Sequence, residues 1–286
     1  PAMTWKSTAL APLNLGLKVK LVDTEKKSSN FDLDDLRKKI SKDTRVIIVV
    51  HLYGNPGDIK EIKKIIKGKK IHIIEDAAQA MGSYHKKKHA GSFSQVAAFS
   101  THPLKNLNAL GDGGFITTNN KKIYQKIKLL RNHGIKKRDY IEIYGVNSRL
   151  DVLNAEILKI RLKKLKTINN QRKQNVDIYR KILKKNNFIS IQDDKKDQIN
   201  SYVMFLVQCH NRDKLQKYLN SFKIQSLVYY GTPLHLHPAT KNLGFKKGSL
   251  PVAEKLAKKV LALPHHQNLS KKQIHFVANK VNDFYY

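Results

Sequence analysis

Short apolar runs alternate with helical patterns along the first 130 residues, and this alternation constrains the fold more than any other feature of the chain. The apolar runs have strand length and are rich in Val and Ile, whereas apolar residues between them recur at helical spacing. The expected strands are Val19–Val22, Val46–Val50, Ile71–Ile74, Val96–Phe99 and Phe115–Thr118. The expected helices are 32–41, opened by Asp32 as a cap, 58–67 and 121–133. Strands and helices in this order predict an α/β sheet that is largely parallel.

A second part of the chain begins after a long helical pattern. Apolar residues follow helical spacing from Leu150, and more weakly to about Leu183, which predicts one long helix. A polar stretch then precedes a further strand and helix set at Tyr202–Gln208, 212–221, 224–230 and 251–261. Because 286 residues suffice for two cores, we expect a large domain, 1–168, and a smaller C-terminal α/β domain, 169–286, joined by the helix from about 150.

Hydropathy and cysteine content limit the cellular setting. The sequence contains no run of about 18 apolar residues, which excludes a transmembrane helix and a membrane partner. Cys209 is the only cysteine, so no internal disulfide can form. These features predict a protein of the reducing cytoplasm.

The net charge of +33 suggests a nucleic-acid partner, because basic surfaces release counterions from phosphate backbones. Only nine of the 55 basic residues are Arg, however, whereas readout of base edges relies on bidentate Arg. The lysines are spread along the whole chain in short pairs, and no nucleic-acid-binding motif is present. A solvated basic surface is the favoured interpretation, and specific nucleic-acid binding is the weaker alternative.

Lys105 is the only Asp, Glu, Lys or Arg between His89 and Gly111, in a chain where 27% of residues are of these types. A lone amine among small and apolar residues is at least partly desolvated. Desolvation disfavours the ammonium form, lowers the lysine pKa and frees the amine as a nucleophile. Lysines of this kind form Schiff bases.

Two expected strand ends carry polar side chains that suit the same site. Asp76 follows the run Ile71–Ile74, and Ser100 follows Val96–Phe99. Ligands of open α/β sheets bind at the carboxyl ends of the strands. A carboxylate, a hydroxyl and the desolvated Lys105 at this edge predict pyridoxal 5′-phosphate as cofactor, with the carboxylate on the pyridine nitrogen and the hydroxyl on the phosphate. Taken alone, an acidic residue at a strand end is more often simply solvated.

Ordered motifs give essentially the whole chain a resemblance to a known family. They are HLYGNPGDI at 51–59, IEDAAQAMG at 74–82, FSTHPLKNLNALGDGG at 99–114, RNHG at 131–134, GVNSRLDVLNAEIL at 145–158, VYYGTPLHLHP at 228–238 and SLPVAEKLAKKVLALPHH at 249–266. In order and spacing they resemble the sugar aminotransferases of the DegT/DnrJ/EryC1/StrS group. The resemblance implies a fold type I pyridoxal-phosphate-dependent transferase, with a mostly parallel sheet flanked by helices.

The resemblance implies a role for each matching residue near the cofactor. Lys105 would be the catalytic lysine that forms the Schiff base, and Asp76 would partner the pyridine nitrogen. Gln79 would lie near the cofactor hydroxyl or ring face, and Ser100 would bind the phosphate. Trp5, in the segment PAMTWKSTA, would stack on the ring.

Substrates and a partner chain are also implied. L-glutamate would donate its amino group to a keto group of a nucleotide-linked sugar, and the forms GVNSRLD and GDGG are more similar to members that act on 3-keto sugars. Asn147 and Arg149 would reach across a homodimer interface toward the cofactor phosphate and the neighbouring site. Tyr230 and His235 are candidate contacts to the sugar nucleotide. No metal is implied.

The family has a segment upstream of the PAMTW position with a Gly-Thr phosphate-binding turn, and we expect that segment to be missing here. The lysine at 105 favours transamination over the dehydration performed by members that carry histidine there. A pyridoxal-phosphate-binding regulatory or scaffold protein without catalysis is the alternative within the same fold.

Overall fold

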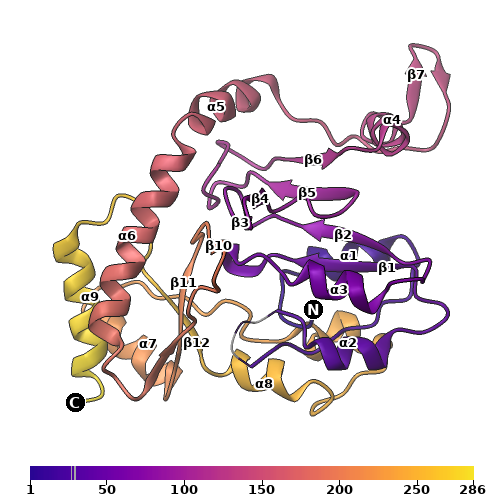
Figure 1. Cartoon of the computed structure of the whole chain (residues 1–286). Coiled ribbons are helices and arrows are strands. Elements are labelled where there is room, and N and C mark those ends of the chain that lie inside the picture. Colours follow the sequence, from indigo (N-terminus) through magenta and orange to yellow (C-terminus); the bar gives the residue numbers. More distant parts are fainter. Residues whose placement is uncertain (27, 29) are drawn as a thin grey trace.

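The central sheet of the molecule has four strands. The computed structural model describes residues 1–26, 28 and 30–286. The strands, in the spatial order β1-β2-β5-β6 (Figure 1), are β1 (Val46–Val50), β2 (His72–Asp76), β5 (Val96–Ser100) and β6 (Gly114–Thr118). Strands β1, β2 and β5 are parallel, and β6 is antiparallel to β5 at the edge. The expectation of a largely parallel α/β sheet is confirmed.

Two helices pack against β1 and β2 through one apolar cluster. Helix α2 (Leu33–Lys39) begins at Asp32, whose Oδ1 accepts hydrogen bonds from the backbone N–H groups of Asp34 and Asp35 at 2.9 and 3.0 Å. This cap satisfies two donors of the first turn. Helix α3 (Ile59–Ile65) follows β1. The shared cluster includes Leu36, Ile47, Val49, Ile59, Ile62 and Ile73.

A second, antiparallel sheet lies in the C-terminal part, in the order β12-β11-β9. Its strands are β9 (Ile189–Ile191), β11 (Phe205–Cys209) and β12 (Val260–Leu263). Helices α6 (Leu165–Leu183), α7 (Arg212–Ser221) and α9 (Lys271–Asp283) pack on it. Their common core includes Val176, Tyr179, Leu183, Phe205, Val207, Leu215 and Ile274. The hydroxyl of Tyr179 donates to the carbonyl of Pro264 at 2.9 Å, so its polar end is satisfied inside this core.

Three expected elements, apart from the long helix described below, differ from the structure. Val19–Val22 forms no strand with any of the described residues, although the N–H of Ala2 donates to the carbonyl of Val22 at 2.9 Å. The expected strand 224–230 is reduced to one bridge between Leu227 and Ala262. The expected helix 251–261 ends early, as α8 (Pro251–Ala257), because the run that follows is buried on both faces and pairs with β11 as β12.

The long helix expected from about 150 is two helices. Helix α5 (Val152–Leu162) is capped by Lys163, and α6 by Lys164. The φ and ψ angles of Lys164 are −98° and −4°. A separate apolar cluster joins the first residues of the chain to its C-terminal part. It includes Ala2, Met3, Leu21, Leu52, Tyr53, Leu234, Leu250, Leu256 and Val260. Since this cluster crosses the expected domain boundary, the division at 168 stays a prediction.

The remaining strands form small hairpins. β3 (Tyr84–His85) and β4 (Lys88–His89) are joined by Lys86 and Lys87, exposed residues with φ of 47° and 66°. β10 (Gln198–Ile199) pairs with β3, although the two are far apart in sequence. β7 (Ile135–Lys137) and β8 (Tyr140–Ile141) form an arm that stands away from the body beyond α4 (Lys121–Leu130) (Figure 1).

Helix α1 (Ser7–Asn14) and three 3-10 turns, Leu52–Gly54, Leu234–Leu236 and Pro238–Leu243, complete the described structure. Within residues 1–26, 28 and 30–286, no helix has both the length and the apolar composition needed to span a bilayer.

Candidate active site

Asp76 ends β2 at the carboxyl edge of the central sheet. It pairs in register with Val50 of β1 and with Ala98 of β5, so it lies between two parallel neighbours. Its Oδ2 accepts a hydrogen bond from Oγ1 of Thr8 at 2.7 Å, and its Oδ1 accepts one from the backbone N–H of Ala78 at 3.2 Å. The side chain is half-buried, so a ligand can still reach the carboxylate.

Lys105 lies on the loop that follows β5, in a turn where its N–H donates to the carbonyl of His102 at 2.8 Å. The next residue fixes this loop to the rest of the molecule. Nδ2 of the buried Asn106 donates to Oδ1 of Asn169 at 2.7 Å and to the carbonyl of Ser201 at 2.6 Å. Lys105 is therefore presented from a loop that is anchored both to α6 and to the segment before β11.

Burial lowers the pKa of the Lys105 amine below its usual 10.5, and the negative charge of Asp76 opposes that shift. The two side chains are therefore within electrostatic range of each other. A lowered pKa increases the neutral fraction of the amine, and the neutral amine is the nucleophile. The desolvation expected from the uncharged surroundings of Lys105 in the sequence is confirmed.

Ser100 ends β5, one strand away from Asp76, and faces Gly114 of β6. Its Oγ accepts a hydrogen bond from the backbone N–H of His102 at 3.3 Å, which leaves its O–H available to a ligand. A hydroxyl donor at a strand end suits a phosphate oxygen. Binding of the cofactor phosphate by Ser100 stays a prediction.

The side-chain amide of the buried Gln79 is already engaged by protein groups. Its Oε1 accepts the backbone N–H of Tyr53 at 2.6 Å, and its Nε2 donates to the hydroxyl oxygen of Tyr230 at 2.8 Å. The two tyrosine rings have centroids 5.8 Å apart, and both residues have left-handed backbone angles, with φ of 60° and 57°. Burial raises the pKa of Tyr230 to about 12, so its hydroxyl stays protonated. Gln79 supports these tyrosines, and its contact with the cofactor stays a prediction.

The other predicted residues differ in their exposure. Trp5 is 56% exposed, just before α1. Asn147 and Arg149 are exposed in the segment between β8 and α5. His235 is buried, and its Nε2 lies 2.9 Å from Oε1 of Glu254. His235 is thus turned into the interior, and the roles of all four residues stay predictions.

Sequence patterns alone miss three residues that shape this site: Thr8, Tyr53 and Asn106. Thr8 follows Thr4 at helical spacing, which predicts that both lie on one face of a helix. This spacing does not predict the contact of Thr8 with Asp76, which is 68 positions away. Tyr53 precedes Gly54 in a turn, and Asn106 adjoins the predicted lysine. Both lie within the motifs HLYGNPGDI and FSTHPLKNLNALGDGG, and membership of these motifs is their only signal in the sequence.

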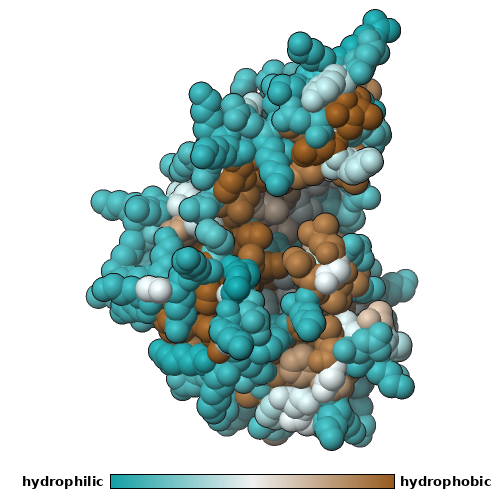
Figure 2. Space-filling model, turned by 90° about the vertical axis from the view of Figure 1, so that its right-hand side faces the viewer, coloured by the Kyte–Doolittle hydropathy of each residue, from teal (hydrophilic) through white to brown (hydrophobic). Residues whose placement is uncertain are grey.

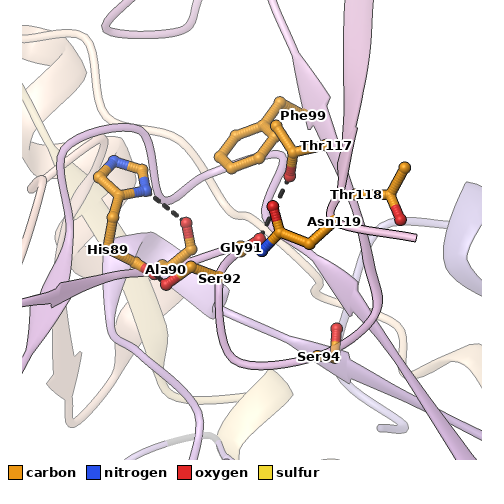
Figure 3. Close-up of a pocket in the computed structure, with 9 residues that line it drawn as sticks. All are labelled: His89, Ala90, Gly91, Ser92, Ser94, Phe99, Thr117, Thr118 and Asn119. Atoms are coloured by element: carbon orange, nitrogen blue, oxygen red, sulfur yellow. Dashed lines mark hydrogen bonds between the residues drawn. The ribbon is translucent and has the colours of Figure 1, made fainter. Parts of the chain in front are cut away.

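A separate hollow lies beside the loop between β4 and β5 (Figure 3). It is lined by His89, Ala90, Gly91, Ser92, Ser94, Phe99, Thr117, Thr118 and Asn119. Oγ1 of Thr117 donates to the carbonyl of Gly91 at 3.2 Å, and Oγ of Ser92 donates to the carbonyl of His89 at 2.6 Å. These groups satisfy one another, and none of the predicted site residues lines the hollow.

The donor set at the sheet edge fits pyridoxal 5′-phosphate. The carboxylate of Asp76 is fixed by two donors and would hold a protonated ring nitrogen. The amine of Lys105 has the lowered pKa that reaction with a carbonyl carbon requires, and Ser100 offers a hydroxyl to a phosphate. The fold and this site define a pyridoxal-phosphate-dependent enzyme of the α/β class.

Comparison with known proteins gives the family. A model of the DegT/DnrJ/EryC1/StrS aminotransferase family matches residues 1–282, and the chain belongs to this family of pyridoxal-phosphate-dependent sugar aminotransferases. The chain is 38% identical over 271 residues to the erythromycin biosynthesis sensory transduction protein EryC1 of Saccharopolyspora erythraea, covering 95% of this chain and 74% of that protein. It is 36% identical over 286 residues to the dTDP-3-amino-3,6-dideoxy-alpha-D-galactopyranose transaminase of Aneurinibacillus thermoaerophilus, covering 100% and 78%.

The same assignment follows from solved structures. The X-ray structure of DesV from S. venezuelae, solved with a ketimine intermediate, matches with a TM-score of 0.96 and 33% sequence identity, covering 99% of this chain and 76% of DesV. The fold class and the cofactor expected from the motifs are confirmed. The chain spans about three quarters of the length of these relatives.

Proposed function

We propose that the protein transfers the amino group of L-glutamate to the 3-keto group of a nucleotide-linked sugar. The observation that carries this proposal is the pair formed by Lys105 and Asp76, with the pKa of the amine lowered by burial at the carboxyl edge of the sheet. The relative from Aneurinibacillus thermoaerophilus, whose name specifies a 3-amino sugar, supports the 3-position.

Each residue has a distinct task in this proposal. When bound, pyridoxal phosphate supplies an electron sink for the α-carbon of the amino acid. The amine of Lys105 accepts the proton of that α-carbon and later returns a proton, as general base and acid. Asp76 would hold the proton on the ring nitrogen, Ser100 would donate to the phosphate, and Trp5 would cover the ring. Fixed placement of these groups replaces random encounter, which lowers the entropic part of the barrier.

The substrate end of the site rests on residues that are farther from Asp76 in the sequence. Tyr230 carries a protonated hydroxyl and is held by Gln79, which suits a contact to a sugar hydroxyl. Arg149 would reach an anionic group of the nucleotide. His235 would act only if its bond to Glu254 opened.

A second copy of the chain is the partner that we propose. Hydrophobic side chains gather in patches on the face shown in Figure 2. Residues 140–162 expose many large apolar side chains, namely Tyr140, Ile141, Tyr144, Val146, Val152, Leu153, Ile160 and Leu162. Monomeric proteins rarely expose such area in one segment. Asn147 and Arg149 lie within it, so a homodimer formed there would bring both to an interface. A monomeric mass in light scattering at working concentration would contradict the homodimer.

The test of the reaction uses L-glutamate with nucleotide-linked sugars that carry the keto group at C-3 or at C-4. Amino sugar formation is followed by mass spectrometry, and 2-oxoglutarate is measured in the same samples. Amination of the 3-keto sugar with equal release of 2-oxoglutarate supports the proposal. Amination of the 4-keto sugar alone would contradict the assigned position, and failure with every sugar would contradict the reaction.

A regulatory or scaffold protein that binds the cofactor without catalysis is the second candidate. The name of the Saccharopolyspora relative, which specifies sensory transduction, favours it. The half-reaction with L-glutamate alone separates the two candidates. Release of 2-oxoglutarate, equal to the amount of bound cofactor, supports the enzyme, and no release supports the regulatory protein. The cytoplasmic location expected from the sequence stays a prediction.

A further inference from the structure

Two threonines and Asp76 form a chain of hydrogen bonds that nothing in the sequence motifs assigns. Oγ1 of Thr4 lies 3.0 Å from Oγ1 of Thr8, which in turn donates to Oδ2 of Asp76 at 2.7 Å. Thr4 is 4% exposed and Thr8 is half-buried. Thr8 belongs to α1, and its N–H donates to the carbonyl of Trp5 at 3.1 Å, so the same turn carries the tryptophan expected to cover the ring.

The direction of these bonds follows from the groups involved. An ionised carboxylate can only accept, so Thr8 donates its proton to Asp76. The oxygen of Thr8 is then free to accept the proton of Thr4, and the chain runs from Thr4 through Thr8 to Asp76. Successive donors of this kind polarise one another and strengthen the last bond. A hydrogen bond to a charged acceptor is also stronger than one between neutral groups.

This chain fixes the orientation of the carboxylate. Thr8 donates to Oδ2 and the N–H of Ala78 donates to Oδ1, so the plane of the carboxylate is held at both oxygens. Without Thr8, the carboxylate would rotate more freely and would lose orientation before binding.

We propose that Thr8 is a positioning residue for the cofactor: it holds the carboxylate of Asp76 in the orientation that binds the pyridine nitrogen. The inference rests on the proposed role of Asp76. It differs from a purely structural role for Thr8, in which the bond only attaches α1 to the end of β2. A structural attachment would affect every ligand of the site equally, whereas the positioning role depends on the ring nitrogen.

The experiment compares pyridoxal 5′-phosphate with its carbocyclic analogue, in which a C–H group replaces the ring nitrogen. Both retain the aldehyde and the phosphate, so they differ only in the group that Asp76 contacts. Dissociation constants are measured on the purified full chain, freed of cofactor, by quenching of the fluorescence of Trp5, the only tryptophan. Far-ultraviolet circular dichroism and urea unfolding establish that each variant is folded.

Thr8→Val keeps the branched shape and removes the hydroxyl, and Thr8→Ser keeps the hydroxyl. We expect Thr8→Val to weaken binding of the natural cofactor about tenfold, the size expected for one hydrogen bond to a charged group. Binding of the carbocyclic analogue should change less than about twofold, well below the tenfold that one such bond represents. Thr8→Ser should restore the preference for the natural cofactor. The dissociation constant of Thr4→Val for the natural cofactor should lie between those of Thr8→Val and the unaltered chain.

Three results would overturn the inference. Equal weakening of both compounds by Thr8→Val would assign Thr8 a structural role, and no weakening of either would remove any role. An unaltered chain that binds both compounds equally would contradict the role of Asp76 itself, and the inference would fall with it. The positioning role is supported if the unaltered chain binds the natural cofactor more tightly than the analogue, Thr8→Val loses this preference and Thr8→Ser regains it.

Discussion

Nε2 of His51 lies 2.9 Å from Oε2 of Glu75, and neither side chain is exposed to solvent. Nδ1 of His51 accepts the backbone N–H of Gly57 at 2.9 Å, so Nε2 is the nitrogen that donates to Glu75. Glu75 also accepts the N–H of Gly91 at 2.6 Å and both the N–H and the hydroxyl of Ser94, at 2.6 and 2.8 Å. Burial alone would raise the pKa of Glu75, but these bonds lower it below its usual value.

Glu75→Gln should destabilise the protein by about 3 kcal/mol, because an amide has one acceptor oxygen where four donors converge. At least one buried N–H would then lose its partner. Glu75 precedes Asp76 in β2, so the loss falls at the strand end that carries the candidate site. Urea unfolding measures the change. Glu156→Gln, which alters only an exposed pair with Lys159, should change stability by less than about 0.5 kcal/mol. An equal effect of both variants would contradict the prediction.

Acid should destabilise the protein through His265. Burial, with the positive charge of Arg172, lowers the pKa of this imidazole from 6.5 to about 3. The unfolded chain therefore binds a proton at His265 between about pH 6.5 and pH 3, and the folded chain does not. The free energy of unfolding should fall as pH decreases through that window.

The measurement compares unfolding free energies at several pH values in His265→Asn and in the unaltered chain. The variant should show a shallower decline with falling pH, because it lacks the group that titrates only when unfolded. His275→Asn, at an exposed position, serves as the control and should keep the original slope. Parallel slopes in all three proteins would show that His265 does not contribute.

The sequence patterns predict the ends of the strands, but they do not predict the contacts between distant segments. Asp76 and Ser100 could be placed because apolar runs mark strands, and strands of one sheet end at a common edge. Lys105 could be selected because charge is absent around it. The bond between Gln79 and Tyr230 spans 151 positions and depends on left-handed backbone at the tyrosine, which no local pattern encodes.

The prediction of secondary structure was wrong where pairing with distant segments decides the structure. Val19–Val22 has strand composition but forms no ladder with the described residues, and the apolar run at 260–263 pairs in a sheet instead of continuing a helix. The break between α5 and α6 lies between two lysines of good helix propensity. Local preference there favours one continuous helix, and the break has no counterpart in the sequence pattern.

Lys105→Ala should abolish amination and the visible absorbance of the bound cofactor. The variant loses both the nucleophile and the group that moves the α-proton, and loss of general acid–base catalysis alone costs about 10³-fold. Lys105→Arg keeps a positive charge but not a neutral amine, so it should be inactive as well. Lys126→Ala, at an exposed position of α4, should retain activity and absorbance. Normal turnover by Lys105→Ala would falsify the assignment of this lysine.

Gln79→Ala separates two roles for the glutamine. If Gln79 mainly supports Tyr53 and Tyr230, the variant leaves the buried N–H of Tyr53 without its partner and a strained φ of 60° without support. The free energy of unfolding should then fall by about 2 kcal/mol even in protein freed of cofactor. Gln198→Ala, which removes a 3.3 Å bond to the carbonyl of Pro56, should cost much less. If the cofactor-free variant is as stable as the unaltered chain and only its affinity for pyridoxal phosphate falls, Gln79 serves the cofactor directly. Urea unfolding without cofactor and a cofactor titration of the same variant therefore distinguish support of the tyrosines from direct binding.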